Sequence, residues 1–134
     1  MMMKKIVGMS CLLSLSSLAL AEDLTGVWQL VSGEYVNGSG DLVDYQDHDL
    51  QSLKVISRSH FSFTSMKGTE FWASGAGTYE VADGKYTEKL QHNSFGEEAG
   101  TLYIFDTKIE GEYWYNSRWE DGKRVEYEVW KRVE

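Results

Sequence analysis

The chain of 134 residues contains 21 acidic and 13 basic residues, which give a net charge of −8 at pH 7, together with one cysteine and no proline. This acidic balance argues against nucleic acid or anionic lipid as a partner, because binding to either depends on Lys and Arg side chains that neutralise phosphate. A single cysteine also excludes an internal disulfide framework.

The first 21 residues have the pattern of a secretory signal peptide. Lys4 and Lys5 precede an apolar, Leu-rich run that ends in Ala19-Leu20-Ala21, a small-x-small cleavage site. Cys11 lies inside this run rather than directly after a small-residue box at its end, which favours simple export over lipidation. We expect cleavage after Ala21 and a periplasmic or secreted protein. No second apolar run of about 18 residues follows, so no transmembrane segment is predicted.

Residues 22–134 have the length of one domain with a modest core. Loss of Lys4 and Lys5 with the leader leaves 11 basic against 21 acidic residues, a net charge of −10. Cys11 leaves as well, so the exported domain depends on burial and hydrogen bonding for its stability.

This domain is predicted to be all-β, because its apolar residues recur with a period of two and its runs are rich in Val, Tyr, Trp, Phe and Thr. The expected strands are 26–36, 50–58, 60–66, 70–82, 85–93, 101–109, 112–119 and 124–133. Asp83-Gly84 and Asp121-Gly122 supply the positive φ of two-residue hairpin turns, and Gly68 and Gly111 mark two further reversals.

Tight reversals make neighbours in sequence antiparallel neighbours in space, which predicts an up-and-down meander. Closure into a barrel would remove the two unpaired edges of such a sheet. Gly33, Gly75 and Gly77 lie within strands, where glycine marks the bulges and bends of a small barrel. The longer segment 36–49 carries Asp41, Asp44, Asp47 and Asp49, and we expect it to form a solvated lid over the barrel mouth.

A family resemblance rests on LTGVWQLVSGEYVNG (24–38), HFSF (60–63), GTYEVADGKYTE (77–88) and EVWKR (128–132), which are similar to bacterial lipocalin-like domains of unassigned function. Gly26-Val27-Trp28 with Arg132 on the last strand also resembles the wider calycin pattern, in which an N-terminal Gly-x-Trp packs against a basic residue of the final strand. The resemblance implies an eight-stranded antiparallel β-barrel in which the Arg132 guanidinium covers the Trp28 indole and both residues are structural. The chain lacks the cysteine pair and C-terminal helix of many secreted lipocalins, so no specific ligand is transferred.

Alternation also predicts which side chains face the barrel interior. The fifth strand gives the clearest pattern, with Tyr86, Glu88, Leu90 and His92 on the inner face. The same test on other strands predicts inward Leu53, Val55, Phe61, Phe63, Phe71, Ala73, Tyr79, Tyr103, Phe105, Tyr115 and Trp119. On the last strand, an inward Arg132 would place Trp130, Glu128 and Glu126 on the inner face as well. The opposite face is more apolar, with Val125, Tyr127, Val129 and Val133, so the facing of this strand stays open.

An interior of tyrosines and carboxylates differs from the Leu, Ile and Val of a filled barrel, which favours a cavity that holds one small, partly apolar ligand non-covalently. The predicted ligand-binding residues are Tyr79, Tyr86, Glu88, His92, Tyr103, Tyr115, Trp119 and Glu128. Each of them taken singly also fits an ordinary core or rim position, and Glu88 would then pair with Arg118 or Arg58.

Two other functions stay open. A filled barrel could act as a protein-interaction or inhibitor module of the cell envelope, with exposed Trp72 and Trp114 as contact residues. A barrel enzyme, an isomerase or hydrolase, would need a carboxylate or His with a perturbed pKa inside a ligand-sized pocket. No catalytic residue, cofactor or metal site is predicted: the chain has no nucleophile-elbow or phosphate-binding motif, and His48, His60 and His92 lie on separate segments.

Overall fold

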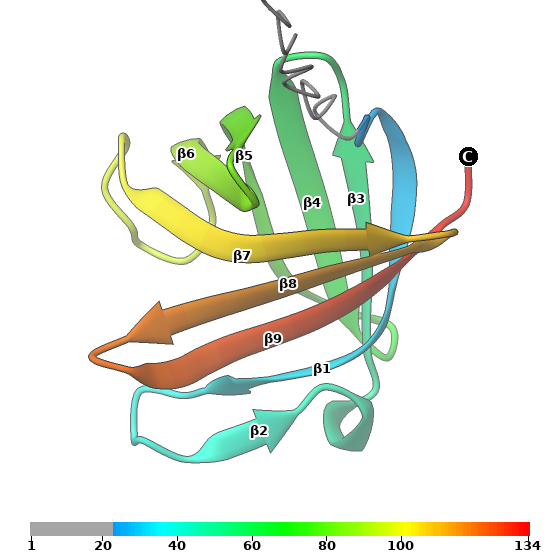
Figure 1. The fold of residues 1–134 in the computed structure, drawn as a ribbon. Helices are drawn as coiled ribbons and strands as arrows, with labels where there is room; N and C mark the ends of the chain where they lie inside the picture. The colour runs from blue at the N-terminus through cyan, green and yellow to red at the C-terminus, as the bar shows by residue number, and fades with distance from the viewer. Residues whose placement is uncertain (1–22) are drawn as a thin grey trace, which may run out of the picture.

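The computed structural model describes residues 23–134, so the expected signal peptide (1–21) and its cleavage site lie outside the described residues. The described part contains nine strands and one short 3-10 helix (Figure 1). In chain order these are β1 (Gly26–Val36), β2 (Leu42–Asp44), η1 (Gln46–His48), β3 (Leu50–Ile56), β4 (His60–Lys67), β5 (Glu70–Ala82), β6 (Lys85–Asn93), β7 (Leu102–Glu110), β8 (Tyr113–Glu120) and β9 (Lys123–Arg132).

Eight of these strands form the predicted closed, antiparallel, up-and-down barrel. Strands β3 to β9 pair with their neighbours in sequence order, and β1 pairs with β3 on one side and with β9 on the other. The closing ladder runs from Trp28 opposite Arg132 to Tyr35 opposite Glu126. The ninth strand, β2, lies outside this ring and pairs with Glu34–Val36 of β1. It arises from the segment that the sequence predicted only as a lid (Figure 1).

The predicted hairpin turns have the backbone that their sequences require. Asp83 and Gly84 have φ values of 52° and 71°, and Asp121 and Gly122 have φ values of 50° and 74°. Two consecutive residues with positive φ define the type I′ turn, whose twist matches that of the flanking strands. These local signals account for the pairing of β5 with β6 and of β8 with β9.

Trp28 and Arg132 join the first barrel strand to the last at one end of the core. Trp28 is fully buried, and the Arg132 guanidinium carbon lies 4.2 Å from the centre of its ring. Arg132 also donates hydrogen bonds to the carbonyl oxygens of Thr25 and Asp23. The predicted stack of cation over indole is therefore present, and it holds the chain that enters β1 against the end of β9.

Four β-bulges change which side chains face inward. They lie where β1 meets β9, β4 meets β5, β5 meets β6 and β8 meets β9. Each bulge adds one residue to a strand, and one extra residue reverses the facing of everything beyond it. The bulge at Gln91 leaves Leu90 inside but turns His92 to the exposed outer face, where it pairs with Ala76, so the predicted inward His92 is wrong.

The bulge opposite Ser65 and Met66 has a similar effect on β5. Ala73 faces the interior as predicted, whereas Phe71 is 58 % exposed, so its predicted inward orientation is wrong. Trp72, predicted as an outer contact residue, instead borders the barrel mouth. A period of two cannot be carried across an unrecognised bulge.

Two further facing predictions are wrong for a different reason. On β3, Leu53 and Val55 are half exposed, while the alternate positions Ser52, Lys54 and Ile56 are buried. On β8, Tyr115 lies on the outer face, Trp119 is exposed, and Trp114 and Asn116 are fully buried. The sequence test placed the more apolar face inward, but these strands bury polar groups. Lys54 is paired with Glu88, and the Asn116 side-chain oxygen accepts a hydrogen bond from Thr107, while its buried amide nitrogen has no partner among residues 23–134.

The facing of the last strand is settled by its pairing with β1. Glu126, Glu128, Trp130 and Arg132 share one face, and Glu128 and Trp130 are buried. The apolar residues of the opposite face form a partly covered exterior, where Val129 is buried and Tyr127 packs under Arg124 at 4.4 Å. The bulge in β9, at Val125, lies before these residues and does not change their facing, so an apolar exterior resolves the two conflicting indications of the sequence.

Candidate functional site

The barrel encloses a cavity of about 200 Å³ above its aromatic core. The core beneath it is centred on Trp28, Tyr86 and Trp114, with ring centres 4.9 Å apart for Tyr86 and Trp114 and 5.2 Å apart for Trp28 and Trp114. A second space of about 350 Å³ shares six wall residues with the cavity and forms its mouth. The barrel is thus filled at one end and hollow toward the other. The volume of the hollow part suits one small ligand.

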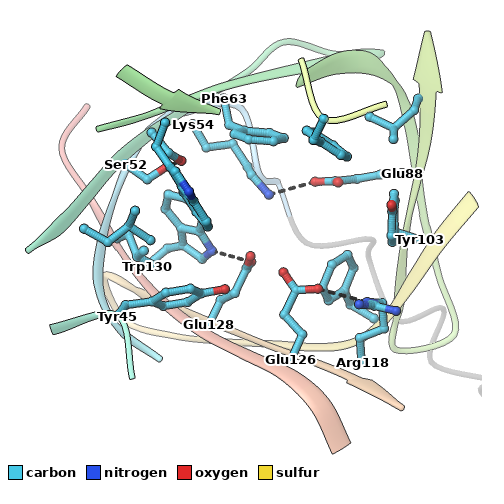
Figure 2. A pocket seen from close by; sticks show the side chains of 17 residues that line it. Tyr45, Ser52, Lys54, Phe63, Glu88, Tyr103, Arg118, Glu126, Glu128 and Trp130 are labelled. Carbon is cyan, nitrogen blue, oxygen red and sulfur yellow. Dashed lines mark hydrogen bonds and ion pairs between the residues drawn. The ribbon is translucent and has the colours of Figure 1, made fainter. Parts of the chain in front are cut away.

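A buried ion pair joins β3 to β6 at the inner end of the cavity (Figure 2). Lys54 Nζ on β3 lies 2.7 Å from Glu88 Oε1 on β6, and the two side chains are 3 % and 6 % exposed. The Tyr86 hydroxyl donates a second hydrogen bond to the same carboxylate oxygen at 2.8 Å. Burial by itself would lower the pKa of Lys54, but the attraction of Glu88 and Glu128 outweighs it and raises the pKa above its usual value. Lys54 therefore carries its charge inside the barrel.

Aromatic rings surround this ammonium group. Lys54 Nζ lies 4.9 Å from the ring centre of Trp130, 5.4 Å from Trp114, 5.6 Å from Tyr86 and 5.9 Å from Phe63. Ring faces are electronegative, so each of these contacts favours the cation in a place that water does not reach. The same burial raises the pKa of the Tyr86 phenol well above its usual value, and the neighbouring Glu88 charge adds to the effect.

A second ion pair lies nearer the mouth. Arg118 Nε on β8 donates to Glu126 Oε2 on β9 at 2.9 Å, and Arg118 Nη1 donates to the exposed Glu120 at 2.8 Å. The Arg118 guanidinium also lies 5.1 Å from the ring centre of Tyr103. Arg118 and Glu126 are each about one fifth exposed, so this pair is more accessible to solvent than Lys54 and Glu88.

Glu128 lies between the two pairs. Its residue is 8 % exposed, and its Oε2 accepts a hydrogen bond of 2.8 Å from the Trp130 indole (Figure 2). Burial raises the pKa of Glu128 to about 7; the Glu126 charge acts in the same direction, while Lys54 and Trp130 oppose it. At neutral pH this carboxyl group is therefore near the midpoint of its titration.

The mouth is lined by aromatic side chains from segments far apart in sequence. Tyr45, which precedes η1, stacks on Tyr35 with ring centres 5.4 Å apart, and Trp72 lies 5.9 Å from Tyr35. Phe63 and Phe95 also line the mouth and stack with ring centres 6.2 Å apart. The predicted lid segment thus contributes one buried ring, Tyr45, while its four aspartates are exposed to solvent as expected.

The structure brings together only part of the predicted ligand-binding set. Glu88, Tyr103 and Glu128 line the cavity. Tyr86 is buried beneath it, and Tyr79 packs against the core with its hydroxyl bonded to the Ser57 carbonyl. His92, Tyr115 and Trp119 lie outside it, for the reasons given above.

Sequence reasoning did not assign Lys54, Tyr45 or Trp72 to the cavity. It placed Glu126 inward only together with Arg132, and it considered Arg118 only as a partner of Glu88, a place that Lys54 takes. A lysine in the middle of an otherwise apolar strand (SLKVI, 52–56) carried a signal, because a charge at such a position is paired when it is buried. The partner of Lys54 is 34 positions away in sequence, and no local pattern identifies it.

Among residues 23–134, no group of three or more His, Cys, Asp or Glu side chains is arranged to hold a metal ion. Within the same residues, no helix has the length and apolar character needed to cross a membrane. What the cavity offers is an array of fixed charges, hydrogen-bonding groups and aromatic walls, which can bind and orient a small molecule.

Comparison with known proteins places the chain in a family. Residues 23–134 match the family described as a domain of unknown function, DUF4488, and the chain belongs to that family. No curated protein and no solved structure matches it significantly.

Proposed function

We propose that this member of the DUF4488 family is an exported, lipocalin-like binding protein that holds a small, partly apolar molecule non-covalently in its barrel. The observation that carries this function is the hollow half of the barrel, a cavity of about 200 Å³ with charged groups inside and aromatic rings at its mouth. A barrel selected for stability alone would fill this space with apolar side chains, because buried charges cost desolvation free energy that hydrophobic residues avoid. Binding is the simplest use of such a cavity.

Native mass spectrometry tests this function. The protein is purified from the cells that make it, or from their medium, and its mass is compared before and after denaturation. We expect a discrete excess mass that is lost on denaturation. Export predicts in addition that the mature chain begins at Glu22, which N-terminal sequencing of the same sample determines.

Two matched variants on β4 connect the bound mass to the cavity. Ser65 is buried and lines the cavity, whereas Ser62 on the same strand is exposed on the outer face. Ser65→Phe should fill the cavity and abolish the excess mass, and Ser62→Phe should leave it unchanged. Equal excess mass in both variants, or none in the wild-type protein, would contradict binding inside the barrel.

A barrel enzyme is the second candidate, and Glu128 favours it. Its pKa of about 7 inside a ligand-sized cavity is the property expected of a general acid or base. The same experiment separates the two functions. A binding protein releases the molecule that it carried, whereas an enzyme incubated with that molecule yields a product of different mass or structure, and Glu128→Gln would stop this conversion.

The protein-interaction alternative has lost one of its predicted contacts, because Trp114 is fully buried in the core. Trp72 is 38 % exposed, but it borders the mouth of the cavity. It therefore fits a ligand entrance as well as a protein interface.

A further inference from the structure

We propose that the molecule held in this cavity is a small organic monocation, an amine that carries an aromatic or alkyl group, and that its ammonium group binds to Glu128. This inference rests on the proposed binding function and specifies the chemical class of its ligand. Three features carry it: the count of charges around the cavity, the position of Glu128, with which no Lys or Arg of residues 23–134 forms an ion pair, and the aromatic walls of the mouth.

The charges that line the cavity do not balance. Two cations, Lys54 and Arg118, face three carboxylates, Glu88, Glu126 and Glu128. Lys54 is bonded to Glu88 and Arg118 to Glu126, so both cations already have a carboxylate partner. With Glu128 ionised, the cavity therefore has one negative charge in excess, and one positive charge on a ligand would neutralise it.

Glu128 is the carboxylate without a cation of its own. Within residues 23–134, no Lys or Arg nitrogen forms an ion pair with it, and the Trp130 indole is bonded to Oε2. Its carboxyl group points into the cavity toward that of Glu126, and this contact raises the pKa of Glu128, so a cationic donor from a ligand would meet both carboxyl groups (Figure 2). A buried carboxylate is stabilised strongly by a charged donor, which an ammonium group supplies and a neutral ligand does not.

Charged and titratable groups face Glu128 from several elements. Lys54 lies on β3, Glu88 and Tyr86 on β6, Arg118 on β8, Glu126 on β9 itself and Tyr45 before η1, whereas its neighbour on β1 is Gly33. Of these, Lys54 favours the charged form of Glu128 and Glu126 opposes it. Binding of a cation therefore adds to the effect of Lys54 and removes a proton from Glu128.

The mouth suits the remainder of such a ligand. Four aromatic rings line it: Tyr45, Phe63, Trp72 and Phe95. An aromatic or alkyl group would pack against these rings while the ammonium group reaches inward. The net charge of −10 of residues 22–134 also raises the local concentration of a cation at the protein surface.

Phenethylamine and 2-phenylethanol form a matched pair of probes, because they differ chiefly in the charged group. Their affinities are measured by calorimetry at pH 8 on the mature protein. We expect phenethylamine to bind at least about tenfold more tightly than 2-phenylethanol, as a charge-assisted hydrogen bond is worth more than a neutral one. Equal affinities, or tighter binding of the alcohol, would overturn the cation proposal and leave the binding function standing.

Two variants locate the charge. Glu128→Gln keeps the shape of the side chain and should weaken phenethylamine binding by about tenfold to a hundredfold, with little effect on the alcohol. Glu110→Gln removes the same charge at an exposed position on β7, 58 % exposed, and should leave both affinities within about twofold. An equal effect of both variants would mean that the overall field, not Glu128, binds the amine.

The pH dependence gives a readout that does not depend on any variant. An alkylammonium group stays protonated between pH 5.5 and 8, whereas Glu128 takes up a proton over this range. Phenethylamine affinity should therefore fall as the pH is lowered, and binding at pH 6 should release a proton. An affinity that rises toward low pH would instead show that protonated Glu128 donates a hydrogen bond to a neutral acceptor. If neither probe binds at any pH the cation proposal fails, and if Ser65→Phe also leaves the native mass unchanged the binding function fails with it.

Discussion

The buried pair of Lys54 and Glu88 gives the most informative test of the structure. Their charged atoms lie 2.7 Å apart and their side chains are 3 % and 6 % exposed, so water screens neither charge. Removal of one partner leaves the other charge buried without compensation, which costs about 3 to 5 kcal/mol of unfolding free energy. We expect Lys54→Met to fall within this range. Glu88→Gln should cost about 3 kcal/mol, at the lower end, because Glu128 also attracts Lys54.

The double variant should recover much of this loss. Lys54→Met with Glu88→Gln removes both charges while keeping most of the side-chain volume, and such neutral replacements of buried pairs are often close to neutral in stability. The costs of the two single changes should therefore exceed the cost of the double change by at least about 2 kcal/mol. Urea unfolding at pH 7, followed by tryptophan fluorescence, measures all three free energies.

A matched exposed pair serves as the control. Lys85 and Asp106 face one another across β6 and β7 with side chains 55 % and 49 % exposed. Lys85→Met and Asp106→Asn should show a coupling below about 1 kcal/mol, as solvent screens such pairs. If the Lys54 and Glu88 substitutions prove additive within about 0.5 kcal/mol, the two charges do not interact in the folded protein and no buried ion pair spans the cavity.

Three further predictions concern pH, the barrel seam and a bulge. Folding raises the pKa of Glu128 from 4.5 to about 7, so the stability that its protonated form contributes is complete below pH 4.5 and is lost as the pH rises to about 7. Glu128→Gln should therefore be more stable than wild type at pH 8.5, by about 3 kcal/mol, and similar to it at pH 4.5. Urea unfolding at both pH values measures the difference. Arg132→Met loses the stack on Trp28 and two hydrogen bonds to carbonyl oxygens, and should lower the unfolding free energy by about 2 kcal/mol; an unchanged urea midpoint would remove its structural role. Gly77→Ala would place a Cβ 1.9 Å from the Lys89 carbonyl oxygen and should cost at least about 2 kcal/mol, more than Gly84→Ala in an open turn, with thermal unfolding of both variants as the measurement.

The sequence determined the architecture of this barrel because its signals are local. A period of two along each run, an Asp-Gly pair at two turns and glycines at two more reversals predicted eight strands, their antiparallel order and their closure. The extra strand β2 was not predicted, because its three residues are too few to show a periodic pattern. The resemblance of Gly26-Val27-Trp28 and Arg132 to the calycin pattern likewise anticipated the stack that joins β1 to β9.

The cavity was predicted less well, because facing depends on register. His92 and Phe71 were assigned to the wrong side by bulges at Gln91 and Trp72, whose positions follow from pairing between strands and not from the strand itself. Tyr45 reaches the mouth only because its segment folds back onto β1. Such positions are fixed by contacts with other strands, which no single stretch of sequence contains.

The amino-acid sequence by itself thus determined that this is an acidic, all-β meander with aromatic and charged residues distributed along its strands, since backbone propensity and turn chemistry act within a few residues. Only the tertiary structure decided that Lys54 faces Glu88 and that Glu128 forms no ion pair with a Lys or Arg of residues 23–134. The physical reason is that a charge can be buried only beside a partner, and barrel closure selects that partner from a distant strand.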